Sequence, residues 1–229
     1  MATNDTSNRS LPQRALRLWV ASALGMGAVF FLPAGTLAYW QAWVYMGVLL
    51  IPMIFVVRRL LTASPRLLER RMQMREREVT QKRLISFSAL FFLAAFLLPG
   101  FDRRWGWSSV PLPVVLAADA VVLLSYGLTI RVLLENEFAS RTVEVMQGQR
   151  VISTGPYAFV RHPMYLAVLL MVLASPMALG SWWALLLALS IIPILVVRIL
   201  DEEKVLARDL EGYAEYRQKV RYRMVPGLW

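Results

Sequence analysis

The sequence lacks cysteine altogether and contains a single histidine, His162. Without cysteine, the chain has no disulfide bonds, no thiolate metal ligands and no cysteine nucleophile. One histidine excludes a zinc site that needs several histidine ligands. Charged residues are also scarce, at 17% of the chain, whereas a soluble domain has about 25%. The chain is therefore too poor in charge for an ordinary soluble globular protein.

Long apolar segments take the place of the missing charge, since 58% of the 229 residues are hydrophobic. No charged residue occurs from Leu18 to Val57 or from Met164 to Val197. Each run is long enough for two membrane-spanning helices of about 20 residues. Two more spans are expected at residues 84–101 and 110–134. We therefore predict an all-α integral membrane protein with about six transmembrane helices and both termini on one side.

Turn residues divide the two long runs. Pro33-Ala34-Gly35 interrupts the first run, and Ser175-Pro176 and Gly180-Ser181 interrupt the second. Proline and glycine are the residues that most often end or break a helix. Each run is therefore predicted to form a helical hairpin, the second with two short spans.

The net charge of +10 is distributed unevenly along the chain. Of the 25 lysines and arginines, all but Arg103 and Arg104 fall on the side of the membrane that carries the termini. Loops with such a bias lie in the cytoplasm, and the same charge attracts anionic lipids. The charge therefore predicts cytoplasmic termini and gives no support to nucleic-acid binding. Arginine far outnumbers lysine, as in bacteria with GC-rich genomes, so a bacterial inner membrane is the expected location.

The polar residues of three further segments indicate where each segment lies. The basic stretch 62–83 is expected to lie as an amphipathic segment on the lipid headgroups. Apolar residues recur at helical spacing from Glu202 to Val220, which predicts an amphipathic helix that either packs on the bundle or membrane surface, or covers a site. Asp119 falls within the fourth span, where a carboxylate costs about 2.5–3.5 kcal/mol. We therefore expect Asp119 to face the bundle interior and to hydrogen-bond a neighbouring span.

The first group of candidate site residues is the run Gly155-Pro156-Tyr157-Ala158-Phe159-Val160-Arg161-His162-Pro163-Met164-Tyr165. Its glycine and prolines predict a turn, a short helical piece and a new helix that begins near Pro163. The N-terminus of that helix presents backbone N–H groups to a polar or anionic ligand. Without a ligand role, Arg161 would be a snorkelling anchor and His162 an interfacial cap.

The second group is formed by Arg198 and Glu202, one helical turn apart at the cytoplasmic end of the last span. They form either a helix-end ion pair, worth about 0.3–0.5 kcal/mol when exposed, or part of a site. The two groups lie at opposite ends of one helical hairpin and therefore on the same side of the membrane. Ionisable groups that meet at a membrane-facing cavity favour a functional site.

The two motifs together resemble a known family. Gly-Pro-Tyr-x3-Arg-His-Pro-x-Tyr, followed by Arg-x3-Glu-Glu and a Tyr-x2-Tyr tail that ends near Pro226, is similar to the isoprenylcysteine carboxyl methyltransferase family. The broader group includes membrane phospholipid methyltransferases. The resemblance divides the chain into N-terminal spans with a basic cytoplasmic loop (residues 1–134) and a methyltransferase core (residues 135–229). That core would consist of a cofactor loop, a helical hairpin and a C-terminal helix.

The resemblance implies S-adenosylmethionine as methyl donor, bound at the cytoplasmic face without a Rossmann domain. The sequence agrees, because it has no glycine-rich dinucleotide-binding motif. Arg198 would lie near the acceptor carboxylate, and Glu202 would close the donor pocket; the roles of Glu202 and Glu203 are not separated by the sequence. The other cofactor contacts carried over from the family are Gln149, Arg150, Val151, Ile152, Tyr157, His162, Pro163, Met164 and Tyr165.

The chemistry of the residues favours one acceptor class. Methyl transfer from a cationic sulfonium to a carboxylate neutralises both charges, so a site shielded from water assists it. The step needs positioning rather than a base, whereas an amine acceptor must first lose a proton. Arg198 as a carboxylate clamp therefore favours carboxyl O-methylation of a lipophilic, isoprenylcysteine-type substrate. The alternatives are a phospholipid N-methyltransferase, a small-thiol S-methyltransferase, a nicotinamide-dependent sterol reductase and a non-catalytic membrane protein that retains the motifs.

Overall fold

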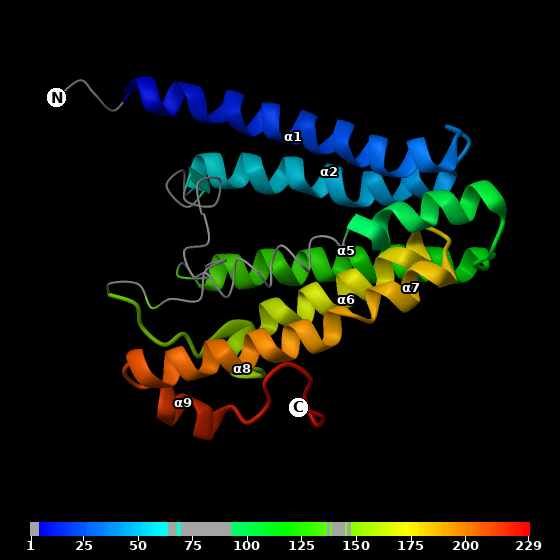
Figure 1. Cartoon of the computed structure of the whole chain (residues 1–229). Helices are drawn as coiled ribbons and strands as arrows, with labels where there is room; N and C mark the ends of the chain where they lie inside the picture. Colours follow the sequence, from blue (N-terminus) through cyan, green and yellow to red (C-terminus); the bar gives the residue numbers. More distant parts are fainter. Residues whose placement is uncertain (1–4, 64–67, 70–92, 137, 139–144, 146–147) are drawn as a thin grey trace.

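The computed structural model describes residues 5–63, 68–69, 93–136, 138, 145 and 148–229, and within them every regular element is a helix (Figure 1). The elements begin with α1 (Asp5–Ala34) and α2 (Trp40–Ala63), and residues 93–105 are helical as well. The chain continues with α5 (Leu112–Glu135), η1 (Gly155–Ala158), α6 (Pro163–Ala178), α7 (Trp182–Ala188), α8 (Ile191–Asp209) and α9 (Tyr213–Lys219).

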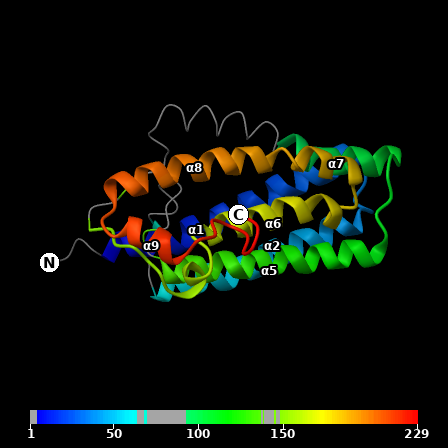
Figure 2. The ribbon, with the colours of Figure 1, turned by 90° about the horizontal axis from the view of Figure 1, so that it is seen from below.

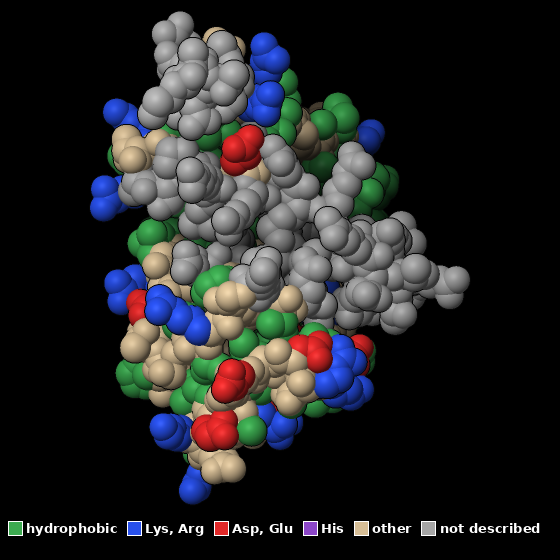
Figure 3. All heavy atoms as spheres, turned by 90° about the vertical axis from the view of Figure 1, so that its left-hand side faces the viewer, with side chains coloured by type: hydrophobic (Ala, Val, Ile, Leu, Met, Phe, Trp, Pro, Cys, Tyr) green, Lys and Arg blue, Asp and Glu red, His purple; other side chains and the backbone are tan. Residues whose placement is uncertain are grey.

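The long helices lie side by side along one direction and form a bundle (Figures 1 and 2). One end carries the start of α1, the last turns of α2, α5 and α8, and the first turn of α6 (Figure 1); we call it the basic end. Figure 3 shows this end, with lysine and arginine side chains spread around its described part. The lysines and arginines near the ends of α2, α5 and α8 and in α9 include Arg58, Arg59, Arg131, Lys204, Arg208, Arg217 and Lys219.

Four helical segments of the described chain are long and apolar enough to cross a membrane. They are Leu11–Ala34, Trp40–Thr62, Leu112–Glu135 and the continuous stretch Trp182–Asp209, while α6 is a shorter apolar helix. Large apolar side chains project outward from these segments, as expected for a surface in contact with lipid; examples are Leu24, Leu32, Phe55, Leu124 and Leu186. The predicted all-helical membrane fold is confirmed. Residues 84–92 of the predicted third span and most of the basic stretch 62–83 lie outside the described residues, while residues 93–101 of that span are helical.

The turn between α1 and α2 falls where the sequence predicts it. Helix α1 ends at Ala34, and Gly35 has a φ of 65°, a left-handed conformation that glycine adopts without a Cβ penalty. In the second hairpin, the predicted break at Ser175-Pro176 is wrong, because α6 continues to Ala178 with Pro176 in its final turns. The chain reverses at Gly180 instead, with a φ of 78°.

The predicted amphipathic helix from Glu202 to Val220 is two helices rather than one. Helix α8 ends at Asp209, and Gly212, with a φ of 79°, starts α9 in a new direction. A left-handed glycine cannot be part of a continuous α-helix, and the break folds α9 back toward the bundle. The apolar positions still face one way after the break, and they form a small cluster described below.

The core lies among α1, α2, α5 and α6, with buried side chains from each helix. Asp119 is 5% exposed within it, as expected of a carboxylate that faces the interior. The expected hydrogen bond to a neighbouring span is absent, because neither carboxylate oxygen of Asp119 has a partner among the described residues.

A second buried carboxylate, Asp102, joins three segments at the opposite end of the bundle. Its side chain accepts hydrogen bonds from the Ser108 backbone N–H at 2.7 Å, the Ser108 hydroxyl at 2.5 Å and the Ser181 hydroxyl at 2.5 Å. The Ser181 hydroxyl also accepts a bond from the Ala184 N–H, so it caps α7. Asp102 is 1% exposed, and it therefore fixes the start of α7 from within the structure.

Candidate functional site

The loop that leads into the candidate site is attached to the end of α5. Thr154 donates its hydroxyl to Glu135 at 2.5 Å, and the Asn136 amide donates to the Tyr157 hydroxyl at 3.0 Å. Gly155 has a φ of 57°, and a Cβ at this position would lie 2.7 Å from the Glu135 carboxyl group. A larger residue would therefore be strained by the left-handed backbone and would push the Glu135 carboxyl group away from Thr154.

The motif from Gly155 to Tyr165 folds as predicted. A short 3-10 helix, η1, is followed by α6, which begins at Pro163 with His162 as its N-cap residue. Proline suits the first helical position because its fixed φ fits a helix and the N–H it lacks would have no partner there. This geometry brings His162 and Tyr165 to the basic end, beside the last turns of α8.

Helix α8 presents two adjacent rows of side chains to this motif. Leu195, Ile199 and Glu203 are spaced by four residues and are all buried. Arg198 and Glu202 have the same spacing on the neighbouring row, and both are partly exposed. The helical period of 3.6 residues therefore separates the two consecutive glutamates, Glu202 and Glu203, into different environments.

Tyr165 connects the two residues of the exposed row. Its hydroxyl donates to Glu202 Oε2 at 2.5 Å and accepts a hydrogen bond from Arg198 Nε at 2.9 Å. The guanidinium and the carboxylate are thus held by one phenol that comes from another helix. The sequence suggested a direct helix-end ion pair as the alternative to a site, whereas the structure adds a hydrogen-bonded partner from the second motif.

Glu203 lies at the centre of a buried ionic cluster. Its Oε1 accepts from Arg161 Nε at 2.7 Å, and its Oε2 accepts from Arg223 Nε at 2.9 Å. His162 Nε2 lies 3.4 Å from Oε1, while His162 Nδ1 lies 4.0 Å from Glu202 Oε1. The side chains of Arg161, His162 and Glu203 are each about 5% exposed or less. Arg161 is therefore a buried structural cation rather than a snorkelling anchor.

The C-terminal tail runs beside the Arg161-His162 segment. The backbone N–H of Arg161 donates to Tyr222 O at 3.0 Å, and that of His162 donates to Arg223 O at 2.7 Å. Arg161 Nη1 donates to the carbonyls of Val220 and Arg221, both at 2.8 Å. Four hydrogen bonds from two residues thus attach the tail to the start of α6.

Helix α9 packs against the cofactor loop that the sequence predicts. Tyr213, Tyr216 and Val220 are buried together with Val151 and two leucines of the α8 end. The Tyr216 hydroxyl donates to the Tyr157 carbonyl at 2.8 Å. Burial raises the pKa of the Tyr213 hydroxyl and that of the Tyr216 hydroxyl, so both phenols stay neutral. Through this packing and the Tyr216 hydrogen bond, α9 fixes the position of the loop.

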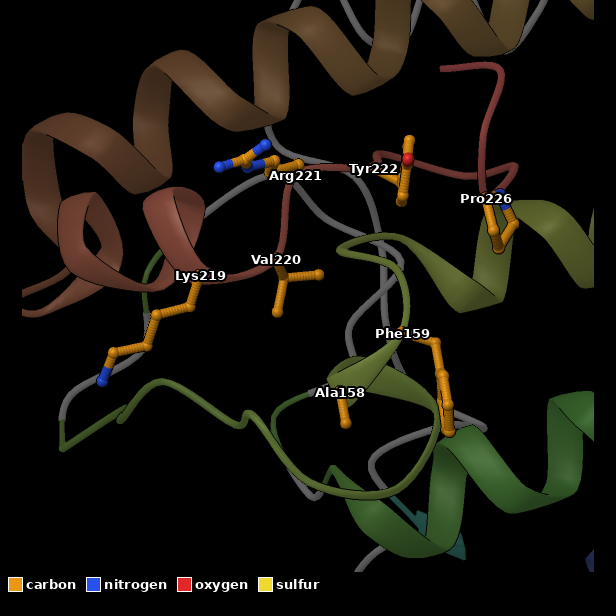
Figure 4. Close-up of a pocket in the computed structure, with 7 residues that line it drawn as sticks. All are labelled: Ala158, Phe159, Lys219, Val220, Arg221, Tyr222 and Pro226. Carbon is orange, nitrogen blue, oxygen red and sulfur yellow. The ribbon is translucent and has the colours of Figure 1, made fainter.

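A cavity of about 310 Å³ opens between η1 and the tail (Figure 4). Figure 4 shows Ala158 and Phe159 on one side and Val220, Tyr222 and Pro226 along the other. Lys219 and Arg221 complete the lining. The cavity is adjacent to the ionic cluster, because its walls are the same two segments that Arg161 joins.

The structure brings most of the predicted site residues together. His162, Tyr165, Arg198 and Glu202 form one hydrogen-bonded or closely spaced group, with Pro163 and Met164 in the first turn of α6 beside them. Val151 and Tyr157 reach this region through their contacts with α9. The remaining predicted residues lie on the described part of the loop: Gln149 and Ile152 are partly buried, and Arg150 is exposed.

Sequence reasoning missed several residues that build the site. Glu203 could have been recognised from its four-residue spacing to Leu195 and Ile199, which marks it as buried. Arg223 and Asn136 carried no local pattern, because their partners are distant in the sequence. Among the described residues, no group of three or more His, Asp or Glu could hold a metal ion.

The fold and the side-chain contacts together define a helical membrane protein with a cluster of polar and charged side chains at its basic end. Residues 115–208 match the Isoprenylcysteine carboxyl methyltransferase (ICMT) family. The structure is also similar to that of a eukaryotic intramembrane Ras methyltransferase, isoprenylcysteine carboxyl methyltransferase. The TM-score is 0.53 and the identity 17%, over 99% of this chain and 88% of that one, a level that demonstrates a shared fold. A comparison with curated proteins finds no match.

The matched region runs from α5 to the end of α8 and thus includes both motifs of the candidate site. This match and the shared fold confirm the resemblance to the isoprenylcysteine carboxyl methyltransferase family that the motifs predict.

Proposed function

We propose that the chain transfers a methyl group from S-adenosylmethionine to the carboxylate of a lipophilic, isoprenylcysteine-type acceptor. The observation that carries this proposal is the Tyr165 hydroxyl, which holds Arg198 and Glu202 together at the basic end of the bundle. One cation and one anion are thereby fixed side by side. The cation suits an acceptor carboxylate, and the anion suits a cationic donor.

The residues of the site fit the donor. S-adenosylmethionine, when bound, supplies an activated methyl group on a cationic sulfonium. Glu202 is the partly exposed carboxylate of the group, with a side chain 28% exposed, and it would attract the positive charges of the donor. Tyr157, His162 and Tyr165, together with the loop residues Gln149, Arg150, Val151 and Ile152 and the first-turn residues Pro163 and Met164, would complete the pocket.

The acceptor would bind through Arg198. Its guanidinium Nε is oriented by Tyr165, and a guanidinium binds a carboxylate with two parallel hydrogen bonds. Positioning of this kind supplies the main catalytic contribution when no proton has to move. His162 lies between Glu202 and Glu203. This arrangement suits an imidazole ring that is held in a fixed orientation better than a base that removes a proton from an amine acceptor.

The location of the site supports a lipophilic acceptor that enters from the bilayer. Helices α6 and α8 belong to the helical hairpin, and α5 is the neighbouring helix. The basic end of these helices would face the cytoplasm of a bacterium, with both termini on that side. In this arrangement residues 1–134 would form the scaffold and residues 135–229 the catalytic core. The head of the acceptor would reach Arg198 while its apolar chain stays among lipid-facing side chains.

Donor binding tests the site assignment. We expect detergent-purified protein to bind S-adenosylmethionine, and we expect Glu202→Ala and His162→Ala each to weaken binding by about tenfold or more, equivalent to 1.4 kcal/mol. Isothermal titration calorimetry measures the affinity. Glu215→Ala is the matched control, because Glu215 is an exposed glutamate on α9. Equal affinity in the wild type, Glu202→Ala and His162→Ala would contradict the assignment.

A further inference from the structure

The two consecutive glutamates of α8 contact different parts of the molecule. Glu202 bonds Tyr165 and is partly exposed, whereas the Glu203 carboxylate is buried and accepts from Arg161 and Arg223. Both Glu203 oxygens are therefore occupied by protein donors. A carboxylate that already accepts from two buried or partly buried guanidinium groups has less capacity left for a ligand than a free one.

The partners of Glu203 lie on segments that are distant in the sequence. Arg161 lies just before α6, and Arg223 lies in the tail after α9. Arg161 also donates to two tail carbonyls, and the Arg223 guanidinium lies 5.2 Å from the centre of the Trp229 ring. One carboxylate on α8 thus holds the start of α6 and the tail together.

We propose that Glu203 is a positioning residue: it holds the C-terminal tail (residues 220–224) against Arg161 and His162, and so forms one wall of the cavity beside the site. The residues of this segment that line the cavity are Val220, Arg221 and Tyr222 (Figure 4). His162 receives its orientation from the same carboxylate, 3.4 Å from its Nε2. Glu202 faces the ligand, while Glu203 acts through the tail and the imidazole.

The two roles predict different consequences of removing each charge. Without the Glu203 charge, the guanidinium groups of Arg161 and Arg223 lose their shared anion, and the backbone bonds from Arg161 and His162 to the tail open more often. Without the Glu202 charge, these bonds remain. Amide hydrogen exchange measures such local opening directly.

The experiment is hydrogen–deuterium exchange on the full chain in detergent, read out on peptides that cover residues 156–166 and 217–229. We expect Glu203→Gln to speed exchange of the Arg161 and His162 amides by about tenfold. Glu202→Gln and the exposed control Glu215→Gln should exchange as the wild type does. Wild-type exchange in Glu203→Gln would overturn the proposal.

Arg223→Gln provides a second variant that is milder and keeps the Arg161–Glu203 pair. It should open the tail less than Glu203→Gln does, Arg223→Lys should restore part of the protection, and the double variant should exchange no faster than Glu203→Gln alone. Such non-additivity is expected when two residues act through one contact. Additive effects would show that Arg223 and Glu203 act separately and would contradict the shared role.

A measurement of methyl transfer can test the role of Glu203 only if the chain has the proposed function, on which this part of the inference rests. Glu203→Gln should raise the KM for S-adenosylmethionine together with the exchange rate, whereas Glu202→Gln should raise the KM alone. If the wild-type chain transfers no methyl group, the proposed function fails, but the exchange measurement still decides whether Glu203 holds the tail. Increased exchange in Glu203→Gln with an unchanged KM would contradict the role of the tail in shaping the donor site.

Discussion

Replacing Arg198 by alanine is expected to lower kcat/KM for a carboxylate acceptor by about a hundredfold, because loss of a hydrogen-bonded charge partner costs about 2–5 kcal/mol. Arg198 is the cation that Tyr165 orients toward the site. The donor affinity should change much less, since Glu202 and His162 remain. Initial rates at varied acceptor and donor concentrations separate the two effects.

Two further variants define the role of Arg198 more closely. Arg208→Ala removes an exposed arginine of the same helix, which pairs with the adjacent Asp209, and should leave kcat/KM unchanged. Arg198→Lys should recover part of the activity, because lysine keeps the charge but not the planar fork of the guanidinium. A folded Arg198→Ala protein with wild-type kcat/KM would remove Arg198 from the site.

Replacing Asp102 by alanine is expected to destabilise the protein by about 3 kcal/mol, because it leaves buried donors unpaired. The groups concerned are the Ser108 hydroxyl and N–H and the Ser181 hydroxyl that caps α7. For a chain of this size the expected decrease in Tm is roughly 6–12 °C. Thermal unfolding in detergent, followed by tryptophan fluorescence, measures it.

The position of Asp102 gives this prediction a clear control. Asp201→Ala removes an acid from α8 that makes an exposed pair with Lys204, and it should shift the Tm by little, because exposed pairs contribute about 0–1 kcal/mol. Asp102 lies at the end of the bundle opposite the site. Donor affinity at a temperature where Asp102→Ala is folded should therefore match the wild type, and an equal Tm for both aspartate variants would show that Asp102 does not fix α7.

The sequence was sufficient for features that depend on local chemistry. Pro33 and Gly35 mark the first turn, and Pro163 marks the start of α6, because these residues restrict the backbone wherever they occur. The apolar runs indicate membrane helices for an equally general reason, since about 20 apolar residues are needed to cross a bilayer. These features needed no knowledge of which helices meet.

Features that depend on tertiary contacts were predicted less well. Pro176 looks like a helix breaker, but near the end of α6 its missing N–H removes only one hydrogen bond, and the helix continues. The spacing of apolar residues from Leu206 to Val220 fits one helix, yet Gly212 divides it so that α9 can pack against Val151. Gly212 is a local signal for the break, whereas the packing of α9 against Val151 involves a distant segment that a local pattern does not reveal.

The candidate site likewise combines features that the sequence predicts with features that depend on tertiary contacts. Both motifs could be recognised from the sequence, and their meeting at one end of a hairpin followed from topology. The roles of Tyr165 and Glu203 could not be derived in this way, because each acts by joining residues from different segments. Arg161 shows this most clearly: its position suggested an interfacial anchor, whereas the structure buries it against Glu203 and the tail.

The central claim, carboxyl methylation of a lipophilic acceptor, is tested most directly by the stability of the product bond. The purified chain in lipid vesicles would receive methyl-labelled S-adenosylmethionine and an S-prenylated cysteine derivative with a free carboxylate; the same derivative with its carboxylate blocked is the control acceptor. We predict label in the first acceptor alone, released as methanol by mild base, as a methyl ester requires. Base-stable label, or equal label in both acceptors, would contradict carboxyl methylation.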